Sequence, residues 1–112
     1  MAKTERPDLQ IDELILPDRT ELLQLSPARA IRVTRLIWDG PDFHDLDLEL
    51  LSWKVGPNEQ LVHAVSFSVI AEHDRAALCE SETCHPGMRM TFQVRNHSDQ
   101  ARRCAFRVEG VE

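Results

Sequence analysis

An apolar period of two dominates the chain from residue 30 onward. Apolar residues alternate with polar ones over 30–38, 64–69, 88–95 and 103–109. Strict alternation predicts β-strands with one buried face, because successive side chains of a strand point to opposite faces. Turn signals such as Asp39-Gly40-Pro41 separate the runs. The chain is therefore predicted to be all-β, an antiparallel β-sandwich or barrel of five to seven strands.

One of these strands changes phase partway along. Leucines at even-numbered positions alternate with acidic residues over 46–50. The apolar residues that follow, Trp53 and Val55, stand at odd-numbered positions. The change falls at Leu51. An extra residue that shifts the side chains to the other face is what a β-bulge supplies. We therefore predict one bulged strand here.

The first 17 residues read differently from the rest. They are predicted to form an extended N-terminal arm, followed by a single β-sandwich domain over 18–112. Asp18 and Glu21 have capping-box spacing, so one or two helical turns are predicted before Pro27. Apolar side chains of the arm are predicted to lie along a sheet or a neighbouring subunit, and the candidate partner-binding residues are Leu9, Ile11, Ile15 and Leu16.

Length and charge exclude several classes of function. A chain of 112 residues fits one domain and leaves little room for a buried substrate pocket, so a non-catalytic binding protein is expected. The net charge of −6, from 13 basic and 19 acidic residues, argues against nucleic acid as a partner. The sequence has neither a signal peptide nor a long apolar span, so we expect no membrane partner. A cytoplasmic location is expected, either free or in a virion assembled there.

An acidic segment is the strongest candidate for a binding site. Asp45, Asp47 and Glu49 are predicted to share one strand face, spaced roughly 6.5–7 Å apart along it. Asp39 and Asp42 lie in the loop before this strand and are close enough in sequence to turn toward Asp45. Clustered carboxylate oxygens suit Ca²⁺, which takes six to eight oxygen ligands in flexible geometry. The segment therefore predicts a calcium site, with Glu49 as an outer ligand.

A second interpretation of the same residues needs no metal. The three strand carboxylates repel one another and require opposing cations. Arg95, Arg103 and Arg107 occur on later predicted strands, and cross-strand ion pairs with them would satisfy the acidic face. The sequence leaves both interpretations open.

The same segment resembles the tellurium-resistance family of TerD-type domains. The likeness rests on Trp38-Asp39, on Asp45-Leu46-Asp47, and on the strand 65–70 with the charged stretch 72–75 after it. It covers roughly residues 30–75, and the chain is shorter than a typical member. The resemblance implies a β-sandwich that binds Ca²⁺ through these aspartates, in a stress-response system linked to tellurite.

Cysteine and histidine form a weaker candidate site. Cys79, Cys84 and His85, with Cys104 or Met88 within reach, are the residue types that bind zinc or copper. The Cys-x4-Cys spacing is loose, and no second pair accompanies it. The favoured interpretation is a polar loop with reduced thiols, in which Cys104 is a small core residue.

Two functions follow from these patterns. The first is a non-catalytic Ca²⁺-binding module in stress response. The second is a structural or assembly protein, such as a virion or other multi-subunit component, whose N-terminal arm contacts a neighbouring subunit. Both make a protein partner or self-association the expected mode of action.

Overall fold

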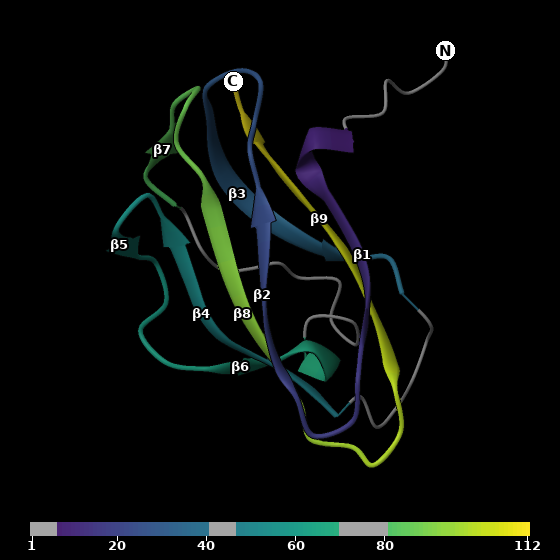
Figure 1. The fold of residues 1–112 in the computed structure, drawn as a ribbon. Coiled ribbons are helices and arrows are strands. Elements are labelled where there is room, and N and C mark those ends of the chain that lie inside the picture. The colour runs from purple at the N-terminus through teal and green to yellow at the C-terminus, as the bar shows by residue number, and fades with distance from the viewer. Residues whose placement is uncertain (1–6, 41–46, 70–80) are drawn as a thin grey trace.

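The fold is a half-barrel of two antiparallel sheets (Figure 1). It is seen in a computed structural model that describes residues 7–40, 47–69 and 81–112. The prediction of an all-β sandwich or barrel is confirmed. Sheet A has the strand order β1 (Gln10–Ile15), β9 (Arg102–Val111), β3 (Ile31–Trp38) and β7 (Thr83–Cys84). Sheet B has the order β2 (Thr20–Leu25), β8 (Met90–Asn96), β4 (Leu48–Val55) and β5 (Asn58–Glu59), and β6 (Val65–Ser66) also pairs with β4. A short 3-10 helix, η1 (Pro7–Leu9), precedes β1.

The core lies between the inner faces of the two sheets. Along β8 every second side chain is buried, as the alternation predicts. Aromatic rings form the centre of the core: Trp53 stacks on Phe92 at a ring distance of 5.7 Å, and Phe106 meets Phe92 edge-on at 5.0 Å. Such pairs add roughly 0.5–1.5 kcal/mol each beyond the apolar area that they bury. The ring contacts therefore tie sheet B to β9 of sheet A.

The predicted bulge in the fourth strand is confirmed. The register of β4 against β8 shifts between Leu50 and Ser52. The Glu59 carboxylate completes the bulge, because it accepts the Trp53 N–H at 2.9 Å and the Ser52 hydroxyl at 2.5 Å. A side chain from β5 thus binds a backbone group that the irregular ladder leaves free.

The short helix predicted after residue 18 is wrong, because residues 20–25 form β2. Asp18 has a φ of 52° and donates its N–H to Ser98 O at 3.1 Å, which makes it a turn residue rather than a helix cap. Leu23 and Leu25 point inward and alternate with exposed neighbours. Six residues pair with β8, and this pairing outweighs the local helix signal.

Residues 10–15 of the expected N-terminal arm lie along one of the sheets. This segment pairs with β9 over six residues and is an edge strand of sheet A. Ile11 and Ile15 are four residues apart, so their side chains lie on the same face of β1, and both are buried in the core. The predicted boundary at residue 17 is instead the connection between the two sheets.

Two further expectations change in detail. The strand predicted over 64–69 is limited to β6, since Ser66 Oγ binds the Ser68 N–H at 3.2 Å and its hydroxyl at 2.8 Å. Local bonds of this kind compete with the sheet ladder. The turn at 96–99, which lies between two predicted strands, joins β8 of sheet B to β9 of sheet A rather than two strands of one sheet. It therefore crosses between the sheets.

Candidate functional site

Asp39 and Asp47, two of the predicted calcium ligands, each face an arginine. Asp39 follows β3, donates its N–H to Ala105 O at 2.8 Å, and forms an ion pair with Arg107 of β9. Asp47 Oδ2 lies 3.8 Å from an Arg102 guanidinium nitrogen. Of the three arginines expected opposite the strand carboxylates, Arg107 instead pairs with Asp39.

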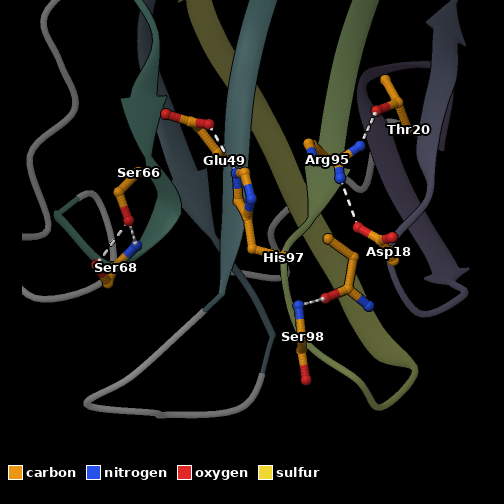
Figure 2. A network of polar contacts seen from close by, with 9 residues as sticks. Asp18, Thr20, Glu49, Ser66, Ser68, Arg95, His97 and Ser98 are labelled. Atoms are coloured by element: carbon orange, nitrogen blue, oxygen red, sulfur yellow. Dashed lines mark hydrogen bonds and ion pairs between the residues drawn. The ribbon is translucent and has the colours of Figure 1, made fainter.

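Glu49 has a different partner from the one that its register suggests. It lies opposite Arg95 in the β4–β8 ladder, yet its Oε1 is 2.8 Å from His97 Nε2 (Figure 2). Asp42 and Asp45 lie outside the described residues. Within 7–40, 47–69 and 81–112, no three His, Cys, Asp or Glu side chains are grouped to hold a metal ion. Calcium binding therefore stays a prediction.

The predicted partner-binding residues divide into buried and exposed. Leu9, Ile11 and Ile15 are buried in the chain's own core, at most 6% exposed. These three side chains therefore contribute to the chain's own core, and a role for them in partner binding stays a prediction. Leu16, at 49% exposed, remains on the surface.

The thiols that can be placed are core residues. Cys84 and Cys104 are free and buried, as predicted for Cys104. Burial raises the pKa of the Cys84 thiol and raises that of Cys104 to about 12. Both thiols are therefore protonated near neutral pH and are poor nucleophiles and metal ligands. Cys79 lies outside the described residues, and the His85 N–H points to Met88 Sδ at 3.4 Å.

A buried amide that the sequence analysis missed holds the two sheet-to-sheet connections together. Asn96 is fully buried; its Nδ2 donates to Ile15 O at 3.0 Å and Gln100 O at 2.8 Å, and its Oδ1 accepts the Ser98 N–H at 2.8 Å. The sequence did contain a signal for this residue, because Asn96 falls at the next inward-facing position of β8 after Phe92 and Val94. A polar residue in that phase needs several hydrogen-bond partners.

Next to it, Arg95 fixes the start of β2. Its guanidinium binds Asp18 Oδ1 at 2.5 Å and Thr20 Oγ1 at 3.2 Å (Figure 2). Together with Asn96, this contact holds residues 16–19 against the end of β8. The network serves the fold, and it sets where the first two strands emerge.

Those two strands border an open groove. β1 is the outer strand of sheet A and β2 that of sheet B, and they approach each other along the same side of the half-barrel. The groove between them has a volume of about 420 Å³ and is lined by Gln10, Ile11, Glu13, Glu21, Leu22, Leu23 and Gln24. We call this side, formed by β1 and β2, the open edge.

Neither a membrane-spanning helix within the described ranges nor a similar known protein adds to this picture. Among the described residues, no helix is both long and apolar enough to cross a membrane. The chain matches no protein-family model, no curated protein and no solved structure.

Proposed function

We propose that this chain is a non-catalytic protein-binding domain that takes part in an assembly through its open edge. One observation carries the proposal. Both sheets end on the same side in six-residue strands, β1 and β2, whose outer edges have no partner strand among the described residues. Unpaired backbone N–H and C=O groups along a strand are a ready template for pairing with another chain.

The exposed leucines support the same surface, whereas the exposed valines Val62, Val69 and Val111 lie on neither β1 nor β2. All of the described leucines that are exposed lie on β1, on β2 or directly after β1: Leu14, Leu16 and Leu22. Each loses contact with water when a partner covers the open edge, and burial of apolar area favours association. This keeps the assembly role expected from the sequence but moves its contact surface.

Site-specific photo-crosslinking tests the proposal. A photo-reactive amino acid at Leu22 is compared with the same group at Val62, which is 98% exposed and lies between β5 and β6. In cells that make the protein, we expect a cross-linked adduct of defined mass from position 22 and none from position 62. The same partner peptide should be found by mass spectrometry in repeated preparations. Equal adducts from both positions, or none from position 22, would contradict the proposal.

Calcium binding is the alternative function, and it has weaker support. Asp39 and Asp47 lie on either side of the stretch that contains Asp42 and Asp45, which keeps the predicted ligand set together in sequence. However, an ion would have to displace Arg107 and Arg102 from the two placed aspartates. Thermal unfolding in Ca²⁺, in Mg²⁺ and in EDTA tests whether the protein binds calcium. A rise specific to Ca²⁺, absent in Asp47→Asn, would favour this alternative, because a ligand that binds only the folded state stabilises it.

A further inference from the structure

The two strands of the open edge differ in how they resist pairing. β1 carries adjacent charges at Asp12 and Glu13. The Asp12 carboxylate accepts two hydrogen bonds from the Arg103 guanidinium, at 2.8 and 2.7 Å. β2 has the sequence TELLQL, with one charge, no proline and an unbroken register against β8. Charges, prolines and bulges are the devices that protect edge strands. β2 therefore offers the more accessible edge.

Two carboxylates face the groove beside β2. Glu13 of β1 and Glu21 of β2 both line it. Neither has an ion-pair or hydrogen-bond partner within the described part of the chain, whereas Asp12, Asp39 and Glu49 each have one. The groove thus gathers unneutralised negative charge at the position where an added strand would place side chains.

The geometry of pairing decides which side chains enter. In a strand added to β2, alternate side chains point into the groove, beside Glu21 and Leu23, and the others lie beside Leu22 on the outer face. A cation in the groove would meet both carboxylates. An apolar residue on the other face would cover Leu22, which is 63% exposed.

From this we infer that β2 accepts an extended strand of a partner protein, with Lys or Arg at the groove-facing positions and apolar residues between them. The inference rests on the proposed function and adds the chemistry of the partner. A second copy of this chain fits less well, because it brings the same glutamates and a net charge of −6. Charge complementarity therefore selects a basic, extended segment of another protein.

Peptide binding tests this inference. The probe is a fluorescent peptide of alternating Lys and Val, six residues long like β2, and binding is followed by anisotropy at low ionic strength. One control peptide carries Glu in place of Lys. Another keeps Lys and Val but has a fully N-methylated backbone, which removes the N–H donors. We expect the Lys–Val peptide to bind and both controls to fail.

Two variants, each of which removes one carboxylate, test whether the Glu21 carboxylate in the groove contributes to peptide binding. Glu21→Gln should weaken binding of the Lys–Val peptide about threefold to fivefold, the size of a good cross-strand charge pair. Asp99→Asn removes one exposed carboxylate outside the groove and should leave binding unchanged. Circular dichroism confirms that both variants are folded. Sedimentation of the protein alone shows whether copies pair.

Several outcomes would overturn the inference. They are no binding of the Lys–Val peptide, equal binding of the Glu peptide, equal losses in the two variants, or unchanged binding after N-methylation. A dimer of this chain that Leu22→Lys dissolves would replace the basic segment with a second copy. None of these results bears on whether position 22 cross-links to a partner in cells, so the proposed function stands or fails separately.

Discussion

On one side of the half-barrel side-chain hydrogen bonds link the two sheets, and on the other side the sheets end in two longer edge strands that border a groove. At the open edge, β1 and β2 each run for six residues without a described partner strand beyond them. On the opposite side, β7 and β5 are two residues long. There the Glu82 N–H binds Gln60 Oε1 at 2.9 Å, and Asn58 Nδ2 binds Glu82 Oε1 at 2.8 Å. We call this the closed edge.

The difference shows where the chain protects its backbone. Short strands and cross-links remove the free hydrogen-bonding groups that cause unwanted pairing, and the closed edge uses both. The open edge has longer strands, and two inward-facing glutamates provide its charge. Inward-facing charges oppose edge pairing unless the partner neutralises them. The closed edge is thus protected by short strands and side-chain hydrogen bonds, whereas the open edge would pair only with a partner that neutralises these glutamates.

Asn96→Ala should have the largest effect, because this residue holds the connection from which both open-edge strands emerge. The change removes the donor for Ile15 O, Leu16 O and Gln100 O and the acceptor for the Ser98 N–H. Several buried groups would lose their partners, so we expect the free energy of unfolding to fall by about 3 kcal/mol. Urea unfolding followed by tryptophan fluorescence measures this loss.

The matched control is Asn58→Ala at the closed edge. Asn58 is exposed and makes one side-chain bond to Glu82. Its replacement should change stability by less than about 0.5 kcal/mol. If the two variants lose similar amounts, the buried network around Asn96 is not what positions the open edge.

Ser81→Ala should have the next largest effect, at the closed edge. The buried Ser81 hydroxyl accepts the Val33 N–H at 2.9 Å, beside a shift in the β3–β9 register between Val33 and Arg35. Alanine leaves this N–H without its acceptor, so we expect a loss of about 1.5 kcal/mol. Amide hydrogen exchange should show faster exchange at Val33 and unchanged rates in β1 and β2. Equal acceleration at both edges would mean that they are not independent.

The alternation of apolar residues was sufficient to predict the fold class and several elements. The strand ending at Trp38 and the bulge after Leu50 both follow from side-chain phase, which one segment displays on its own. The incorrect predictions concern segments whose structure depends on pairing with a strand that is distant in sequence. Residues 20–25 carry a local helix signal that pairing with β8 overrides, and the turn at 96–99 gives no sign of which sheet the next strand joins.

The candidate site was less predictable for the same reason. Whether an aspartate such as Asp39 binds a metal or an arginine depends on which strand lies beside it, and Arg107 is far away in sequence. The apolar residues of the first segment showed that something would cover them, but not that β9 of the same chain would do so. The open groove lies where β1 and β2 have no further strand beside them among the described residues, and no sequence pattern records this.

Glu59 should make the closed edge weakly dependent on pH. Burial opposes the charge of its carboxyl group, but hydrogen bonds from Ser52, Trp53 and Leu61 outweigh this and hold its pKa below the ordinary value of 4.5. The lowered pKa stabilises the fold above pH 4.5, and this contribution is lost as the pH falls through the folded-state pKa. Because the group is largely exposed, the loss should stay under about 1 kcal/mol. Urea unfolding of wild type and Glu59→Gln, compared between pH 3 and 7, measures the difference. A constant difference across this range would contradict the prediction.

Leu22→Lys should have the smallest effect on stability and the clearest effect on association. Leu22 is mostly exposed on the outer face of β2, so the free energy of unfolding should change by no more than about 0.5 kcal/mol. Leu23, the next residue, is buried, and Leu23→Ala should cost about 2–3 kcal/mol. The added lysine blocks the edge with a charge, as natural edge strands do, so the partner identified by cross-linking should no longer co-purify with the Leu22→Lys protein while the fold persists. If Leu22→Lys unfolds the protein, Leu22 belongs to the core and the open edge is not free; if partner binding survives intact, the contact surface lies elsewhere.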